Sequence, residues 1–124
     1  MKTVLTIDDE AMIRDMTALM LERAGYQALG AASADEGLAM MATNKVDLVL
    51  VDVVLPGKNG LELALDLNHK WPTTPIILMS GRVSTAADSI KNFNGRFGIK
   101  SSLAKPFTLE QLVKAVAGAL AGPV

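Results

Sequence analysis

Short apolar runs alternate along the chain with longer stretches in which apolar residues recur every three or four positions. The short runs are typical of strands covered on both faces, and the longer stretches are typical of helices that bury one side. Because the two patterns alternate, we predict a parallel sheet with right-handed crossovers. The predicted strands cover residues 4–7, 26–31, 46–51, 76–79 and 102–104, and the predicted helices begin after the acidic residues 8–10 and near residues 34, 61 and 109.

Local signals mark the ends of several of these helices. Ser33 with Glu36, and Thr108 with Gln111, have the spacing of a capping box, in which two side chains three residues apart close the first helical turn. Gly25 is suited to end the first helix. These signals agree with the boundaries that the apolar spacing predicts.

The first predicted helix carries an apolar stripe. Met12, Met16, Leu19 and Met20 recur in it at helical spacing. Methionine fills irregular gaps in protein cores far more often than it marks a cofactor site. We therefore expect these side chains to be part of the core.

The stretch between residues 81 and 101 does not follow the pattern. Residues 92–98 are rich in asparagine and glycine and are poor helix material. We expect a short helix over Thr85–Lys91, followed by an irregular loop. The sequence contains no linker, repeat or low-complexity stretch, which predicts a single domain over residues 1–124 with no output domain.

Composition narrows the class of protein. At 124 residues and 50% hydrophobic content, the chain is large enough for one core and too apolar for a disordered protein. The net charge of −1 argues against nucleic acid and anionic membranes as partners. No apolar run approaches the roughly 20 residues that cross a bilayer, and the absence of cysteine excludes disulfides and thiolate metal sites. These features fit a small soluble protein of the cytoplasm without membrane insertion.

Polar residues follow four of the predicted strands at the points where they end. Asp8 and Asp9 follow the first strand, Asp52 the third, Ser80 the fourth and Lys105 the fifth. The carboxyl ends of parallel strands lie along one edge of a sheet, where open α/β sheets bind ligands. We therefore expect three carboxylates, one hydroxyl and one ammonium to converge at this edge.

This set of groups suits a divalent cation and a phosphoryl group. Three carboxylates are costly together unless a cation offsets their charge, and oxygen ligands of this kind favour Mg²⁺. Asp52 suits a nucleophile that forms an aspartyl-phosphate, with the cation and Lys105 neutralising charge and Ser80 donating a hydrogen bond to a phosphoryl oxygen. Each residue alone has a simpler interpretation, such as a helix cap, a turn residue or a solvated lysine. Their joint placement at strand ends favours the functional interpretation.

One known family combines these motifs. With its Asp8-Asp9 pair, the stretch Asp52–Gly60, Ser80 after an apolar run and Lys105-Pro106-Phe107, the chain resembles the receiver domain of bacterial two-component response regulators across its whole length. The resemblance implies a flavodoxin-like (βα)5 fold, a doubly wound sheet of five parallel strands in the order 2-1-3-4-5. It also implies a stand-alone regulator of the chemotaxis or cell-cycle relay type, a monomer or weak dimer that docks onto a downstream protein partner.

The resemblance further implies roles for the site residues. Asp52 would accept a phosphoryl group from a histidine kinase or a histidine phosphotransfer protein, and Ser80 and Lys105 would bind the phosphoryl oxygens. The implied ligands of Mg²⁺ are Asp8, Asp9, Asp52 and the backbone carbonyl of Val54. No enzymatic activity is implied beyond Mg²⁺-dependent self-phosphorylation and slow self-dephosphorylation.

The chain departs from the family in the parts that carry the signal. Ser102 stands where many receivers have a Tyr or Phe whose inward turn accompanies activation, and the segment 81–101 is a few residues longer than usual. We hypothesise that Ser80 still moves toward the phosphoryl group and that the segment 81–101 reports the change. Val54 and Arg82 occupy the two positions that flank the path of the hydrolytic water in the family. Valine cannot orient water, so we expect slow self-dephosphorylation.

Two other functions stay open at this point. A phosphate sink or phosphorelay intermediate would take the phosphoryl group without an activated output face, and Ser102 together with the segment 81–101 favours this alternative. A flavodoxin-like electron carrier or an aspartate-nucleophile phosphatase is disfavoured, because no Ser/Thr/Gly-rich loop follows the first strand and no second aspartate lies two residues beyond Asp8 or Asp52. We expect His69, the only histidine, to lie near a helix end without a role in phosphotransfer.

Overall fold

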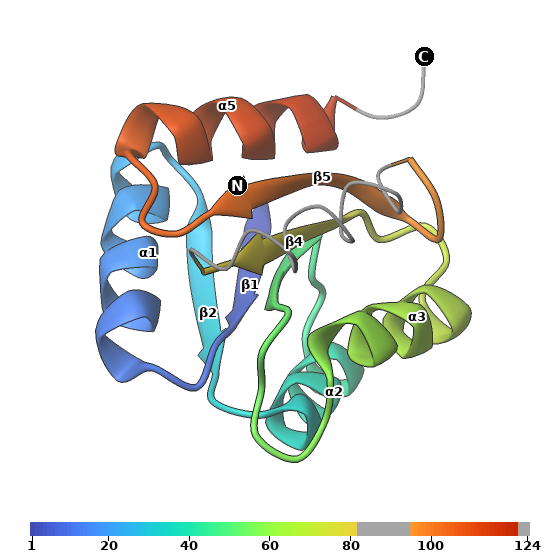
Figure 1. Ribbon diagram of the computed structural model, residues 1–124. Helices are drawn as coiled ribbons and strands as arrows, with labels where there is room; N and C mark the ends of the chain where they lie inside the picture. Colours follow the sequence, from blue (N-terminus) through green and yellow to red (C-terminus); the bar gives the residue numbers. More distant parts are fainter. Residues whose placement is uncertain (82–94, 122–124) are drawn as a thin grey trace.

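The fold is a five-stranded parallel sheet flanked by helices (Figure 1), described by a computed structural model for residues 1–81 and 95–121. The strands are β1 (Thr3–Ile7), β2 (Gln27–Ala31), β3 (Leu48–Asp52), β4 (Ile76–Ser80) and β5 (Ile99–Ala104). The helices in the described ranges are α1 (Ala11–Arg23), α2 (Ala34–Thr43), α3 (Gly60–Lys70) and α5 (Leu109–Leu120). All strand pairs are parallel, in the order β2-β1-β3-β4-β5, which confirms the predicted fold class and strand order. The helix expected over Thr85–Lys91 lies outside the described residues.

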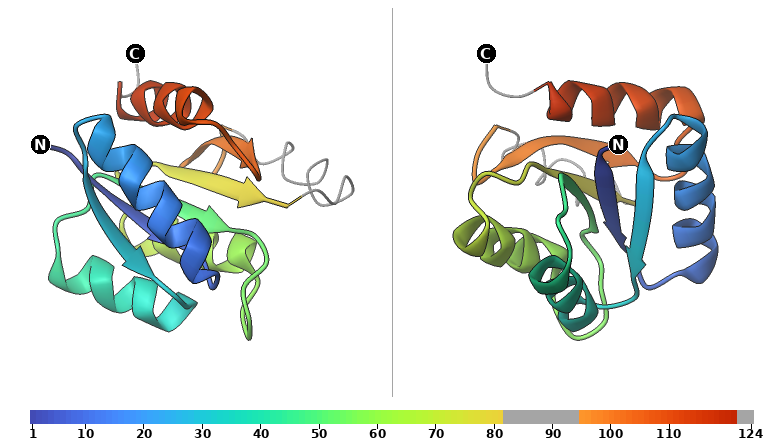
Figure 2. Two further views of the ribbon diagram at one scale, coloured as in Figure 1. Left: turned by 90° about the vertical axis from the view of Figure 1, so that its left-hand side faces the viewer. Right: turned by 180° about the vertical axis from the view of Figure 1, so that it is seen from behind.

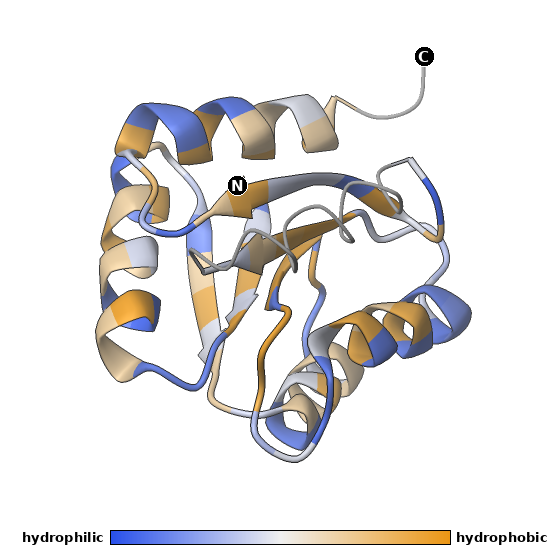
Figure 3. Ribbon diagram, in the orientation of Figure 1, coloured by the Kyte–Doolittle hydropathy of each residue, from blue (hydrophilic) through white to orange (hydrophobic). Residues whose placement is uncertain are grey.

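Helices cover both faces of the sheet (Figure 2). α1 and α5 lie on one face, and α2 and α3 lie on the other. Side chains alternate along β3, so that Leu48 and Leu50 pack in the core under α1 and α5, whereas Val49 and Val51 pack in the core under α2 and α3. Every residue of β1, β3 and β4 is buried, as expected for parallel strands covered twice. The hydrophobic colouring of Figure 3 accordingly follows the strands between the two helical layers.

The predicted helix starts are largely confirmed. Thr108 and Gln111 form the complete capping box: the Gln111 N–H donates to Thr108 Oγ1 at 3.1 Å, and the Thr108 N–H donates to Gln111 Oε1 at 2.9 Å. At α2 the Ser33 hydroxyl oxygen accepts a hydrogen bond from the Glu36 N–H at 3.1 Å. In residues 1–81 and 95–121, no helix has the length and hydrophobicity that crossing a membrane requires.

Most of the apolar stripe predicted for the first helix does not lie in the core, although its fourth member, Met20, is half-buried and packs against the core. Met12, Met16 and Leu19 of α1 are exposed, at 73%, 47% and 62%. The buried residues of α1 are instead Thr17 and Leu21. The prediction was wrong because α1 carries apolar residues on more than one side, so spacing alone does not say which side meets the sheet. An apolar surface therefore extends along α1, beginning beside the loop that follows β1.

Candidate functional site

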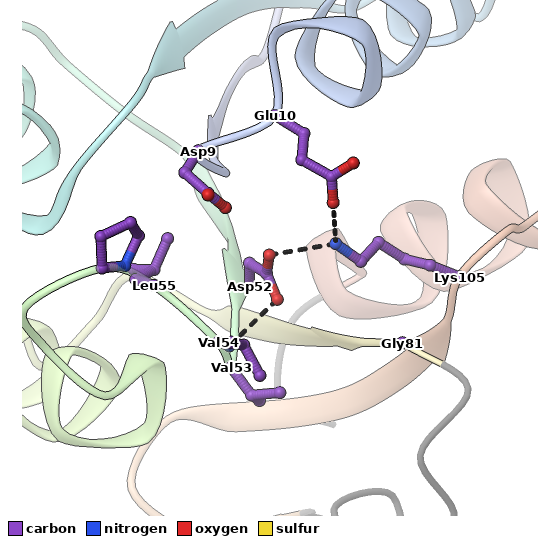
Figure 4. Close-up of a pocket in the computed structure, with 9 residues that line it drawn as sticks. Asp9, Glu10, Asp52, Val53, Val54, Leu55, Gly81 and Lys105 are labelled. Carbon is purple, nitrogen blue, oxygen red and sulfur yellow. Dashed lines mark hydrogen bonds and ion pairs between the residues drawn. The ribbon is translucent and has the colours of Figure 1, made fainter.

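The carboxyl ends of the strands border one cavity of about 410 Å³ (Figure 4). Its walls come from the loops that follow β1, β3, β4 and β5, and they include Asp9, Asp52, Gly81 and Lys105. β1 leads to α1 on one face of the sheet, and the neighbouring β3 leads to α3 on the other. The two connections diverge at this point, which leaves the crevice where sheets of this kind bind ligands.

Three carboxylates meet at this cavity. Asp8 is fully buried, Asp52 is 3% exposed and Asp9 is exposed, and one oxygen from each lies within 4.8 Å of the others. These oxygens are close enough to ligate one ion, and a donor set of oxygens alone suits a hard divalent cation. The first residue of α3, Gly60, lies against Asp52, whereas His69 lies in the last turn of the same helix. His69 is therefore too far away to offer a nitrogen ligand at the cavity.

Lys105 lies between the two buried carboxylates. Its Nζ is 3.0 Å from Asp8 Oδ2 and 3.0 Å from Asp52 Oδ2, and it lies 3.8 Å from Glu10 Oε1 at the cavity rim. Burial disfavours the charged ammonium, but the hydrogen bonds to Asp52 and Asp8 outweigh it and raise the pKa of Lys105 above its ordinary value. Lys105 therefore holds its proton firmly and balances part of the negative charge.

The surroundings of Asp52 disfavour the ionised form of its carboxyl group. Burial raises the pKa of its carboxyl, and the nearby charge of Asp8 adds to the effect. The Val54 N–H, which donates to Asp52 Oδ1 at 3.1 Å, and the Lys105 ammonium act in the opposite direction without cancelling it. The ionised carboxylate of Asp52 therefore lies in an environment that a further positive charge nearby would stabilise.

The loop after β3 is held against α3 by a close backbone approach. A Cβ built on Gly60 would lie 1.9 Å from the Asp52 carbonyl oxygen, so glycine alone fits there. The Gly60 N–H donates to the Val53 carbonyl at 2.9 Å, and an ion pair between Lys58 and Asp66 ties the loop to the helix. The sequence places Gly60 in the stretch Asp52–Gly60 but does not show this role, because the contact depends on how α3 packs against the end of β3.

The adjacent aspartates after β1 are held in different ways. Asp8 Oδ1 accepts the Glu10 N–H at 2.9 Å, while its Oδ2 binds Lys105. The simpler interpretation of the aspartate pair as a helix cap is not confirmed, because in the described residues the N-cap of α1 is Glu10 and no side chain makes a capping hydrogen bond there. Asp9 is exposed and lines the cavity, and its carboxylate is directed toward Asp52 (Figure 4).

Ser80 and Val54 differ in how they meet the cavity. Ser80 ends β4 and is buried, and its carbonyl accepts the Lys105 N–H at 2.6 Å. The lining at this point is formed by Gly81, and neither Ser80 nor the buried Asp8 is among the residues that line the cavity. Asp8 is nevertheless joined to the site through its carboxylate, which lies beside those of Asp9 and Asp52. Val54 does line the cavity, with a side chain that is 70% exposed.

Asp52→Asn should raise the melting temperature of the metal-free protein by a few degrees near neutral pH. The pKa of Asp52 is raised in the folded state, so its ionised form costs folding free energy that a neutral amide does not. Wild type recovers this free energy as the pH falls through the raised folded pKa of Asp52, so the difference between the two proteins should shrink as the pH is lowered from neutral. Thermal unfolding in EDTA, followed by circular dichroism, measures both values. The control is Asp15→Asn, which changes an exposed carboxylate on α1. An Asp52→Asn protein that melts no higher than wild type would contradict the prediction.

Comparison with known sequences identifies relatives of this chain. Residues 4–117 match the family model of the response regulator receiver domain. The phosphate regulon transcriptional regulatory protein PhoB of Pseudomonas aeruginosa is 38% identical over 114 residues, which cover 90% of this chain and 48% of PhoB. Protein PilH of the same species is 32% identical over 124 residues, which cover 98% of this chain and 100% of PilH. The chain spans about half the length of the transcriptional regulators that it matches.

Solved structures agree with the sequence relatives. The chemotaxis protein CheY4 of Vibrio cholerae superposes with a TM-score of 0.87 at 30% identity, over 97% of this chain and 99% of that protein. A CheY-like receiver domain from Methanospirillum hungatei gives a TM-score of 0.83 at 28% identity, over 98% and 94% of the two chains. The matched sequence, the strand order and the acidic cavity lead to one conclusion: this chain belongs to the family of response regulator receiver domains.

Proposed function

We propose that this domain accepts a phosphoryl group on Asp52 from a histidine kinase or a histidine phosphotransfer protein, and that the phosphorylated form signals to a protein partner. The observation that carries the proposal is the arrangement of Asp52, which shares one cavity with a second and third carboxylate and with an ammonium. We propose no enzymatic activity beyond Mg²⁺-dependent self-phosphorylation and slow self-dephosphorylation.

The transfer needs a free oxygen on Asp52 and charge neutralisation around phosphorus. A carboxylate oxygen of Asp52 forms a bond to phosphorus while the bond from phosphorus to the donor imidazole nitrogen breaks, and the released histidine takes a proton from water. Asp8, Asp9 and Asp52, with the Val54 carbonyl, would hold a Mg²⁺ ion, which supplies positive charge to the phosphoryl oxygens when bound. The carboxylate donor set fits this ion, because hard oxygen ligands are what Mg²⁺ prefers.

Lys105 supplies the second positive charge. Before transfer its ammonium binds Asp52 and Asp8, each at 3.0 Å. Transfer replaces the Asp52 carboxylate with an acyl phosphate whose negative charge lies farther into the cavity, so the ammonium follows that charge. The Lys105 N–H is bonded to the Ser80 carbonyl, which connects this movement to the end of β4.

Ser80 links phosphorylation to a change in conformation. Ser80 is buried and is not among the residues that line the cavity, so we propose that its hydroxyl turns toward the cavity when it binds a phosphoryl oxygen. Such a turn pulls on the chain that follows β4, which fits the hypothesis that the segment 81–101 reports phosphorylation. Residues 82–94 of this segment, with Arg82, lie outside the described residues.

A phosphate sink is the second candidate function. Ser102 is half-buried in β5, where the family often has an aromatic side chain, so an aromatic switch is missing from this strand. A sink needs the same chemistry at Asp52 but no change beyond the cavity. The two candidates therefore differ in how far the effect of phosphorylation extends.

Acetyl phosphate with Mg²⁺ should add the mass of one phosphoryl group to the wild-type protein. Asp52→Asn lacks the nucleophile, and EDTA removes the cation, so neither sample should gain mass. Intact mass spectrometry measures the change, and Asp15→Asn should be labelled like wild type because its carboxylate is exposed on α1. A wild-type protein that gains no mass, or an Asp52→Asn protein that gains it equally, would reject the proposal.

Val54→Asn should shorten the lifetime of the phosphorylated protein several-fold. The Val54 side chain is exposed at the cavity and cannot hydrogen-bond the attacking water, whereas an asparagine amide can orient it. Loss of the added mass with time after removal of acetyl phosphate measures the rate. Val54→Ala is the matched control, because it opens the cavity without adding a hydrogen-bonding group. If Val54→Asn loses phosphate no faster than wild type, this role of Val54 is wrong.

Beryllofluoride with Mg²⁺ should change amide exchange well beyond the cavity if the domain is a switch. Beryllofluoride stands in for the phosphoryl group on Asp52, so Ser80 should move and alter protection across the segment 81–101. A sink should show changes only in the loops that line the cavity. Hydrogen exchange with mass spectrometry separates the two, with Asp52→Asn as the control that cannot bind the mimic. Unchanged protection across 81–101 in wild type would reject the switch.

A further inference from the structure

Arg14 connects α1 to the loop that carries the acidic pair. Its Nη1 donates a hydrogen bond to the backbone carbonyl of Asp8 at 2.7 Å. Its stem lies against the end of β2, since a Cβ built on Gly30 would be 3.6 Å from Arg14 Cδ. The half-buried side chain thus reaches back from the helix to the strand end. Sequence reasoning gave Arg14 no role, because nothing in the spacing shows that it bends back to this carbonyl.

The carbonyl that Arg14 binds belongs to the peptide group joining Asp8 to Asp9. The Asp8 side chain is held independently by the Glu10 N–H and by Lys105. The Asp9 side chain is exposed, so its direction depends on the orientation of the backbone that precedes it. A guanidinium hydrogen bond at 2.7 Å restrains that backbone and therefore the position of the Asp9 carboxylate.

We propose that Arg14 is a positioning residue for cation binding. By fixing the peptide between Asp8 and Asp9, it keeps the Asp9 carboxylate beside those of Asp8 and Asp52. The inference rests on the proposed function, because it takes the cation of that function as the ligand. Partners that orient metal ligands from outside the ligand set commonly change metal affinity by about 10- to 100-fold when they are mutated.

The charge of Arg14 has the opposite effect. A guanidinium bound to Asp8 repels a cation at the carboxylate cluster, so loss of the charge alone would tighten cation binding. Loss of the positioning contact would weaken it. The sign of the change in Mg²⁺ affinity therefore distinguishes the two roles, and neither effect requires phosphorylation to be measured.

The test is a Mg²⁺ titration of wild type and Arg14→Met at constant ionic strength, followed by the amide NMR signals of Asp9 and Glu10. Trp71 is unsuitable as the reporter, because it follows the far end of α3. The 11 residues of this helix span roughly 16 Å from the turn that lies near the cavity. Arg14→Met should bind Mg²⁺ about tenfold more weakly. Arg23→Met removes the same charge from the last turn of α1 and should keep wild-type affinity.

Arg14→Lys is the third variant of this test. It keeps the positive charge but not the planar guanidinium, so its affinity should lie between those of wild type and Arg14→Met. Circular dichroism shows whether each variant folds. If Arg14→Met does not fold, Arg14→Lys decides, with weaker binding supporting the role and wild-type binding contradicting it. A folded Arg14→Met protein that binds Mg²⁺ as tightly as wild type, or more tightly, overturns the inference and leaves the proposed function intact. A wild-type protein that binds no Mg²⁺ would instead reject the proposed function.

Discussion

The buried carboxylates of Asp8 and Asp52 share a single ammonium, that of Lys105, with 3.0 Å from Nζ to each. Two negative charges and one positive charge in a region shielded from water leave a net negative charge, which burial makes expensive. The cost is expressed in the raised pKa of Asp52. In the proposed function a bound cation relieves this imbalance and offsets the charge that the phosphoryl group brings. The charge arrangement that makes the site costly to fold is therefore the one that the proposed cation would stabilise.

The rest of the fold keeps these charges from moving apart. The strands that end at the cavity are held in the middle of a doubly covered sheet, and β1, β3 and β4 are buried at every residue. The loops are then fixed by short backbone contacts, among them the close approach of Gly60 to Asp52 and the hydrogen bond from the Lys105 N–H to the Ser80 carbonyl. Positioning charged groups on rigid strand ends is the general way in which such a site is made precise. The hydrophobic core therefore contributes to the electrostatics as well as to stability.

The fold and the convergence of strand-end residues were predictable, because both follow from periodicity: the alternation of patterns gives the parallel sheet, and a parallel sheet gathers its carboxyl ends. Features that depend on packing were not predictable in this way. α1 turned a different side to the sheet, which left Met12 and Met16 exposed. The close approach of Gly60 and the reach of Arg14 both involve distances across the fold that no spacing along the chain encodes.

The two adjacent aspartates after β1 illustrate how neighbours in sequence acquire different tasks. Asp8 belongs to the inward side of the strand end, where it is buried and bound to Lys105 and to the Glu10 N–H, so it acts as a fixed anchor for the ammonium. Asp9 is exposed at the cavity, with its carboxylate beside those of Asp8 and Asp52, and we propose that its backbone positions it. An exposed carboxylate loses less hydration on meeting a cation, whereas a buried one orders the groups around it. In the proposed mechanism the pair therefore combines a rigid anchor with an accessible ligand, and exchanging either residue for a neutral one would remove a different part of the site.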